Sequence, residues 1–303
     1  MANILIGGGS GLVGQRLCTL LTAAGHQVAL LSRRAQKRSP YPVFVWDAKK
    51  GYIDPNALAE ADYVINLAGA GIADARWSKS RKALIISSRV ETTRLLLNSF
   101  KESGKSPKAY LSASAVGFYG DRGEEWMREE AAPGQGFLSE STQIWEQSIQ
   151  EVAEYVPRTI AFRIGIVLST LGGALEKMLL PMNVRTGTYF GDGQQFYSWI
   201  HIDDLCEMFR FAIDNEAVNG IYNAVAPNPS RNIDLVKAIS TAMDKAALIL
   251  PAPAFGLRLA MGEMADVVLS GNRVSADKIE QAGFKFQFPE LVPALRDVLD
   301  KKI

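Results

Sequence analysis

The chain has 303 residues, of which 48% are hydrophobic and 21% are charged, and its formal net charge is +1 at pH 7. These values are typical of a globular protein with a large core, and the near-zero charge gives no field that would favour nucleic acid or a membrane as partner. The chain begins on a predicted strand rather than a signal peptide, and no apolar run is long enough to span a bilayer, so we expect a cytoplasmic protein. Two cysteines and two histidines, distant in sequence, predict neither a disulfide framework nor a metal site.

The first fourteen residues predict a strand, a tight turn and the start of a helix. An apolar run leads into glycines at positions 8, 11 and 14, the spacing G-x-x-G-x-x-G. Gly8 allows a sharp turn, Gly11 leaves room for a pyrophosphate against bare backbone N–H groups, and Gly14 lets the helix pack closely on the strand. An amphipathic helix and a second strand follow, which favours a dinucleotide site over an ordinary glycine-rich turn. The predicted contacts are Gly8, Ser10, Gly11, Leu12 and Val13.

The residues after the second strand, 27–31, indicate which dinucleotide is bound. An NAD-selective site usually places an acidic residue there, which binds the ribose 2′-hydroxyl. This chain instead has Ser32, Arg33 and Arg34, and guanidinium groups bind a 2′-phosphate through charge-assisted, bidentate hydrogen bonds. We therefore predict NADP(H), with Ser32 and Arg33 as the first contacts and Arg34 as the second. The alternative is a solvated basic turn, to which Lys37 and Arg38 would contribute.

The run from residue 63 to residue 69 predicts a fourth strand and its exit. Apolar residues give way to small ones at this exit, so that the backbone can approach the adenosine or the bridging phosphates. An ordinary turn at the end of a strand is the alternative. The candidate cofactor contacts here are Leu67, Ala68 and Gly69.

Helical patterns flank this strand, with one predicted turn at 58–61 and a long helix at 79–103. Arg89 lies among the apolar residues of the long helix, where a charge is costly unless it has a partner. A helix after the fourth strand passes beside the cofactor in such a fold. We therefore predict that Arg89 contacts a cofactor phosphate, and a structural ion pair is the alternative.

A fifth predicted strand, 108–113, is followed by small residues and then by Tyr119 and Gly120. With these residues the sequence resembles an extended short-chain dehydrogenase/reductase and, more narrowly, the atypical epimerase-like branch often labelled cell-division-inhibitor-like. The segments that carry the resemblance are 7–14, 66–69, 76–77, 88–89, Ser114, 119–120, 145–146, 172–175, 191–195, 199–204 and 288–291.

The resemblance implies a catalytic serine at Ser114, which polarises a carbonyl or alcohol oxygen, and a Tyr-x-x-x-Lys pair further along the chain. In that pair the lysine and the nicotinamide ribose lower the tyrosine pKa, so that the phenol exchanges a proton as hydride moves. Counted back from residues 145–146, the two slots hold Leu138 and Thr142, which can neither transfer a proton nor supply a cation. Tyr119 is a candidate substitute acid or base. A structural role is the alternative for both Ser114 and Tyr119.

The resemblance and the strand pattern together predict an α/β fold: a Rossmann-type, doubly wound parallel sheet with a smaller C-terminal substrate lobe. The resemblance also places backbone near Ile166 against the nicotinamide. A Gly- and Gln-rich loop, 187–196, suits recognition of a polar substrate or forms a simple hairpin. The predicted domains are an NADP-binding domain over 1–168 and 197–225 and a small lobe over 169–196 and 226–303.

The second half of the chain carries three local predictions. Asp203 or Asp204 is expected to cap the helix that follows, since aspartate is a favoured N-cap residue. His201 is expected to be structural rather than catalytic. A single amphipathic helix is predicted over 255–269.

Two functions remain open from the sequence. The leading hypothesis is an NADP(H)-dependent oxidoreductase or epimerase-like enzyme acting on a small polar, sugar-like substrate. The rival is a sensor or scaffold that binds NADP(H) without catalysis and presents its small lobe to a protein partner. The absence of the Tyr and Lys pair favours the rival, and the polar loop around Gln194 and Gln195 favours the enzyme. The sequence gives no oligomeric state.

Overall fold

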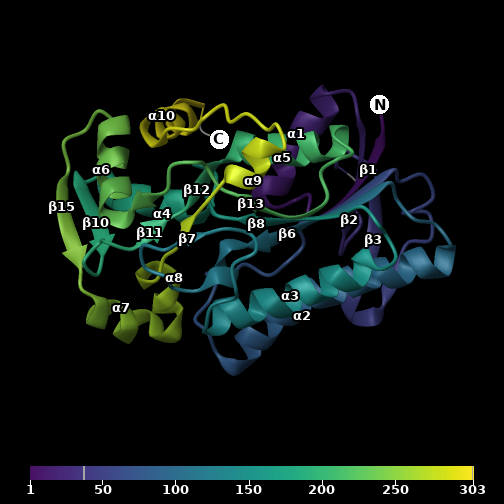
Figure 1. Ribbon diagram of the computed structural model, residues 1–303, viewed down its shortest axis with the longest axis horizontal. Coiled ribbons are helices and arrows are strands. Elements are labelled where there is room, and N and C mark those ends of the chain that lie inside the picture. Colours follow the sequence, from purple (N-terminus) through teal and green to yellow (C-terminus); the bar gives the residue numbers. More distant parts are fainter. Residues whose placement is uncertain (37, 302) are drawn as a thin grey trace.

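The computed structural model describes residues 1–36, 38–301 and 303. Its centre is an eight-stranded sheet in the order β13-β8-β6-β5-β1-β2-β3-β4, parallel except for the short final strand β4 (Figure 1). The predicted Rossmann-type architecture is therefore confirmed. Its strands are β1 (Asn3–Gly7), β2 (Gln27–Ser32), β3 (Val43–Asp47), β4 (Tyr52–Ile53), β5 (Tyr63–Asn66), β6 (Ala109–Ala115), β8 (Thr159–Ile164) and β13 (Gly220–Ala224).

Helices cover both faces of this sheet, as a doubly wound fold requires. One face carries α1 (Leu12–Ala23) and α5 (Ile202–Asp214), and the other carries α2 (Lys79–Ser103) and α3 (Phe137–Ala153) (Figure 1). Separate clusters of buried apolar residues fill the two interfaces. No helix within the described ranges is both long and apolar enough to cross a membrane.

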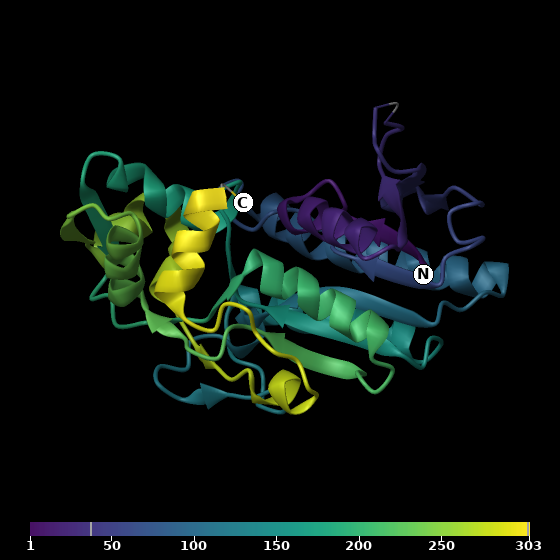
Figure 2. The same cartoon turned by 90° about the horizontal axis from the view of Figure 1, so that it is seen from above.

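The small lobe lies beyond the carboxyl ends of the central strands (Figure 2) and has its own apolar core. Parallel strands β10 and β15 form its sheet. The elements of the lobe are α4 (Gly173–Met182), β10 (Thr186–Phe190), α6 (Asn232–Ala242), β15 (Leu248–Ala252), α7 (Ala254–Met261), η3 (Gly262–Ala265), α8 (Asp266–Leu269) and α10 (Leu291–Lys301).

Short strand pairs join the lobe to the central sheet. These are β9 (Ile166–Leu168) with β12 (Trp199–His201), β11 (Phe196–Tyr197) with β14 (Ser230–Arg231), and β7 (Trp126–Met127) with β16 (Arg273–Val274). After β16 the chain returns to the first domain, where α9 (Asp277–Gln281) lies beside β13 and Lys278 donates to the Ile221 carbonyl at 2.6 Å. The predicted domain boundaries do not include this second crossing.

Three local predictions were wrong. Residues 58–61 form no helix: a turn ends at residue 58, residues 59 and 60 are a bend, and the nearby backbone bonds, such as that from the Ala59 N–H to the Asn56 carbonyl, are isolated. The helix over 255–269 is divided into α7, η3 and α8 at Gly262, whose φ of +61° ends α7. The cap of α5 is the His201 side chain, which accepts from the Asp203 N–H at 3.0 Å, because Asp203 and Asp204 are bound elsewhere.

The glycine at the start of α1 gives a direct test of this packing. A Cβ on Gly14 would lie 2.3 Å from the Gly8 carbonyl oxygen, so Gly14→Ala should lower the free energy of unfolding by about 1–3 kcal/mol. Gly256→Ala in α7 is the matched control, since the nearest atom to its Cβ, Pro253 Cγ, is 3.8 Å away. We expect that control to keep or raise stability. Urea unfolding of both variants checks this, and equal stabilities would contradict the packing role of Gly14.

Candidate functional site

The sheet order brings the predicted cofactor residues to one edge. The carboxyl ends of β2, β1, β5 and β6 lie side by side, and the chain leaves β1 and β5 toward opposite sides of the sheet, into α1 and α2 (Figure 1). Such a switch point opens a crevice in which ligands of parallel α/β sheets bind. The segments at 8–13, 32–34, 67–69 and 114 all lie along this edge.

The glycine turn after β1 has the geometry that its sequence predicts. Gly8 has a φ of +84°, and a Cβ there would lie 2.7 Å from the Leu67 carbonyl carbon. Gly11 is the N-cap of α1 and contributes no side-chain cap, so the N–H groups of Leu12 and Val13 face outward without a capping partner. Ser10 is exposed. These amides, at the positive end of the α1 dipole, are suited to an anion.

Two positive charges without carboxylate partners follow β2. Arg33 and Arg34 are exposed, and among the described residues no carboxylate lies within 4.0 Å of either guanidinium. The Ser32 hydroxyl accepts from the Arg34 N–H at 3.4 Å and from Gln36 Nε2 at 3.1 Å, which shapes the turn. Arg38 is also exposed, whereas Lys37 lies outside the described residues.

The exit of β5 is held by a buried amide. Asn66 is 1% exposed, and its Oδ1 accepts from the Ala68 N–H at 3.1 Å, while the Leu67 N–H donates to the Gly7 carbonyl at 2.8 Å. These bonds hold the backbone from Leu67 to Gly69 against the glycine turn. The predicted wall of small residues therefore lies beside the start of α1.

Arg89 lies directly beneath Gly69, since a Cβ on Gly69 would be 3.0 Å from the Arg89 guanidinium carbon. Its Nη1 donates to the carbonyls of Ala70 and Ile85, and the group lies 5.0 Å from the centroid of the Trp145 ring. Burial lowers the Arg89 pKa to about 10, so the side chain stays charged near neutral pH. The structural ion pair that the sequence left open is not present among the described residues.

Ser114, at the end of β6, is bound to a buried ion pair. Its hydroxyl donates to Glu146 Oε1 at 2.6 Å, and Glu146 in turn accepts from Arg163 at 2.9 and 2.8 Å. Both charged side chains are nearly inaccessible, with 9% and 3% exposure for Glu146 and Arg163. Because a hydroxyl has one hydrogen, this contact leaves Ser114 only lone pairs for any further partner.

The sequence did not predict Glu146 and Arg163 as site residues. An arginine inside the apolar strand β8 was the available signal.

Tyr119 is enclosed in the same network. Its hydroxyl donates to Asn223 Oδ1 at 2.7 Å and accepts from Arg163 Nη1 at 2.9 Å, and the ring is 0% exposed. Burial raises its pKa to about 12 despite the nearby guanidinium. These contacts favour the structural role that the sequence left as the alternative for Tyr119.

Leu138 and Thr142, the residues in the two expected catalytic slots, lie on α3 facing η2 (Val116–Tyr119). A Cβ on Gly117 would lie 3.4 Å from Leu138 Cβ and 3.8 Å from the Thr142 hydroxyl, which donates to the Leu138 carbonyl at 2.7 Å.

Ile166, further along the chain, is half-buried, and its N–H donates to the Ser198 carbonyl at 2.8 Å. That amide is therefore not free for a nicotinamide.

The predicted polar loop borders a hollow of about 460 Å³ in the small lobe. Gln195 is fixed in its wall, since Nε2 donates to the carbonyls of Phe190 and Val268 at 3.2 and 2.8 Å. Arg258 of α7 and Asp192 contribute one charge of each sign to the wall. The residues lining the hollow are Phe190, Gly191, Asp192, Gln195, Ala254, Arg258 and Leu269.

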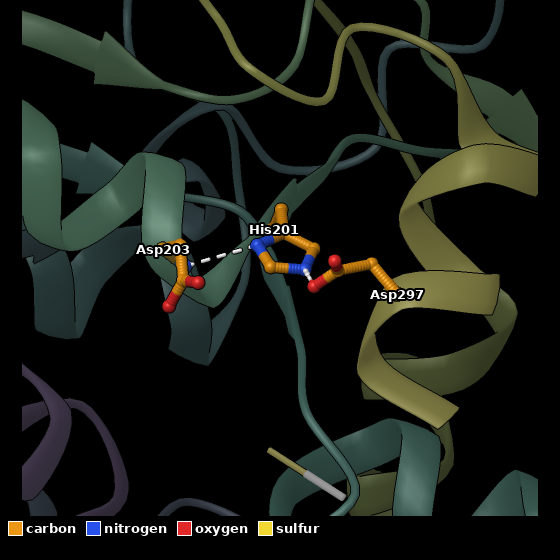
Figure 3. Close-up of side chains that lie close together, drawn as sticks. All are labelled: His201, Asp203 and Asp297. Atoms are coloured by element: carbon orange, nitrogen blue, oxygen red, sulfur yellow. Dashed lines mark hydrogen bonds and ion pairs between the residues drawn. The ribbon is translucent and has the colours of Figure 1, made fainter. Parts of the chain in front are cut away.

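One cluster has the composition of a metal site, namely His201, Asp203 and Asp297 (Figure 3). Each member already has a partner. Both oxygens of Asp203 accept from Arg16, at 2.5 and 2.8 Å. His201 Nδ1 accepts from the Asp203 N–H and so caps α5. His201 Nε2 faces Asp297 of α10 at 3.2 Å. Because Nδ1 is an acceptor here, Nε2 carries the proton, and these contacts support the structural role predicted for His201.

The buried ion pair gives a test with a control on the same helix. Glu146→Gln leaves Arg163 as a buried charge without its partner, so we expect the free energy of unfolding to fall by about 3–5 kcal/mol. Glu151→Gln, also on α3, breaks the exposed pair with Arg94 at 2.7 Å and should cost at most about 1 kcal/mol. Chemical denaturation measures both. Similar losses in the two variants would contradict the central role of Glu146.

Comparison with known proteins agrees with this geometry. Residues 4–224 match the NAD dependent epimerase/dehydratase family, and residues 252–298 match a domain of unknown function, DUF1731. The chain is 35% identical to the epimerase family protein YfhF of Bacillus subtilis, over 99% of both chains. Among solved structures, human epimerase family protein SDR39U1 with NADPH has 31% identity and a TM-score of 0.87, covering 98% of this chain and 99% of that one. A nucleoside-diphosphate sugar epimerase from Corynebacterium glutamicum has 33% identity and a TM-score of 0.78, covering 98% of this chain and 58% of that one. The chain therefore belongs to the NAD-dependent epimerase/dehydratase family, within the short-chain dehydrogenase/reductase fold that its strand order displays.

Proposed function

We propose that this protein binds NADP(H) along the carboxyl edge of the sheet and uses it in an oxidoreductase or epimerase-like reaction. The observation that carries the proposal is the pair of exposed guanidinium groups after β2, Arg33 and Arg34, next to a glycine turn with uncapped amides. A carboxylate at this position would repel a 2′-phosphate, whereas guanidinium groups bind it. The human relative was crystallised with NADPH, which supports the same cofactor here.

The rest of the cofactor has suitable partners along the same edge. The N–H groups of Leu12 and Val13 would hold the pyrophosphate at the start of α1. Arg89, charged and without a carboxylate among the described residues, lies beneath Gly69, where an anion would compensate its burial. The backbone at Leu67 and Ala68 would line the adenosine side.

When bound, the cofactor supplies hydride exchange at its nicotinamide. The chain's own residues would orient the substrate, and Ser114 is the polar group at the end of β6. Since its hydrogen is held by Glu146, Ser114 would accept a hydrogen bond from a substrate hydroxyl rather than donate to a carbonyl. This supports an alcohol group as the binding partner at that position. Leu138 and Thr142 provide no replacement for the usual proton-transfer pair.

The substrate side supports a small polar, sugar-like compound. The hollow of the small lobe offers Asp192 and Gln195 beside the apolar Phe190, a mixture suited to hydroxyl groups and the faces of a sugar ring. The bacterial relative named as a nucleoside-diphosphate sugar epimerase is consistent with that class.

The preference for NADP(H) over NAD(H) tests the proposal directly. Arg33→Ala should weaken NADPH binding by about 10- to 100-fold, the size of a lost hydrogen bond to a charged group, and change NADH binding little. Arg38→Ala, a neighbouring exposed arginine, is the control and should change neither affinity much. Calorimetric titration of the wild type and both variants with each nucleotide measures the six dissociation constants. Equal losses for NADPH and NADH, or equal effects of both variants, would favour the alternative, a solvated basic turn that does not bind the 2′-phosphate.

A second candidate function is an NADP(H)-binding sensor without turnover, and the enclosed Tyr119 together with Leu138 and Thr142 favours it. A panel of carbonyl compounds and nucleotide sugars, followed both by NADPH absorbance and by chromatography of the products, separates the two. We expect the enzyme to convert at least one compound, with net consumption of NADPH if it is an oxidoreductase and without it if it is an epimerase, and to lose that activity in Ser114→Ala. Tight NADPH binding without turnover on any compound would favour the sensor.

A further inference from the structure

A hollow of about 360 Å³ lies at the edge of the central sheet where its strands begin. It is lined by Asn3 and Gln27, the first residues of β1 and β2, and by Pro42, which directly precedes β3. This edge is at the end of the molecule away from the small lobe (Figure 2). The proposed cofactor edge lies at the carboxyl ends of the same strands. Since β1 has five residues, the two edges are about 15 Å apart.

Small side chains create this hollow, on the sheet face that α2 also covers. Ala29 of β2 is half-buried in the floor, with Leu5 of β1 opposite it in the register and Phe44 of β3 on the same face. The covering segment, residues 56–61, contains three alanines, at positions 57, 59 and 61. The short alanine side chains on both sides leave the space between the sheet and this segment unfilled.

Hydrogen bonds between distant residues hold the walls of the hollow in place. The Asn3 N–H donates to Asp62 Oδ2 at 2.8 Å, and the Asp62 N–H donates to the Asn3 carbonyl at 2.9 Å, so the covering segment is fixed to β1 at its end. Lys105 Nζ donates to the Ala59 carbonyl at 2.7 Å. A hollow with fixed walls requires little ordering when a ligand enters, which favours binding.

The size and the lining of the hollow indicate a class of ligand. An apolar cavity of about 150 Å³ holds one benzene molecule, so a hollow of about 360 Å³ has room for two fused rings. The floor is apolar, and Phe44 offers an aromatic ring for an offset or edge contact. The rim is polar, because Gln27, Asn56 and Glu60 are exposed there, and Glu60 has no cation within 4.0 Å among the described residues. The side-chain oxygens of these three residues can accept a hydrogen bond from a ring N–H.

We propose that this hollow is a second binding site, which takes a flat, bicyclic aromatic compound with an N–H group on its ring, as in indole. The ring lies over Ala29 beside Phe44, and its N–H donates to the polar rim. This site is independent of the cofactor, because it lies at the opposite edge of the sheet.

The test titrates the full chain with indole by calorimetry, with and without saturating NADPH. We expect millimolar or tighter binding of indole, and we expect NADPH to leave it unchanged because the two edges are separate. N-methylindole, which has no N–H, should bind about threefold or more weakly, the size of one lost neutral hydrogen bond. Displacement of indole by NADPH, or equal binding of N-methylindole, would contradict the proposal.

Variants that fill the hollow place the bound indole. Ala29→Ile extends the floor into the space and should weaken indole binding at least tenfold. Ala23→Ile is the matched control, since Ala23 is exposed on α1 over the other face of the sheet, and it should leave binding unchanged. If Ala29→Ile does not fold, Ala59→Phe replaces it, because Ala59 is exposed in the covering segment and a larger side chain there closes the hollow from outside. Absence of indole binding by the wild-type chain, or equal binding by wild type and the filled variant, would overturn the proposal.

Discussion

The buried ion pair between Glu146 and Arg163 is the interaction on which the centre of the structure depends. It connects α3 to β8, and through Ser114 and Tyr119 it reaches the end of β6 and the turn η2. Two charges in an apolar interior cost desolvation, and this cost is offset only when each hydrogen-bonding atom has a partner. The pair therefore fixes the four elements in one arrangement, and that arrangement includes Ser114, which we propose contacts the substrate.

Other arginines differ in whether a carboxylate is paired with them. Arg16 and Arg163 are paired with carboxylates and hold helices and strands together. Arg33 and Arg89 have no carboxylate within 4.0 Å in the described parts of the chain; Arg33 is exposed, and Arg89 donates to the backbone carbonyls of Ala70 and Ile85. A guanidinium without a carboxylate is costly in proportion to its burial, so the buried Arg89 depends on these carbonyls, whereas the exposed Arg33 remains solvated.

Local sequence signals predicted the parts of the fold that depend on local geometry. The glycine spacing, the apolar strands and the long helix from Lys79 to Ser103 were all found where the sequence places them, because they follow from backbone sterics and periodicity. Predictions failed where a distant partner decided the outcome. Asp203 does not cap α5, because Arg16, far away in the sequence, binds both of its oxygens. Residues 255–269 do not form one helix, because Gly262 adopts a positive φ beside Arg76.

By itself, the sequence determined the Rossmann-type architecture, the glycine turn after the first strand and the absence of the usual tyrosine and lysine. Each of these follows from residues that are close together in the chain. Only the tertiary structure decided that Ser114 gives its hydrogen to Glu146 and that Tyr119 is enclosed. The physical reason is that burial and charge compensation depend on which distant residues meet. The periodicity of a single sequence does not show which distant residues are in contact.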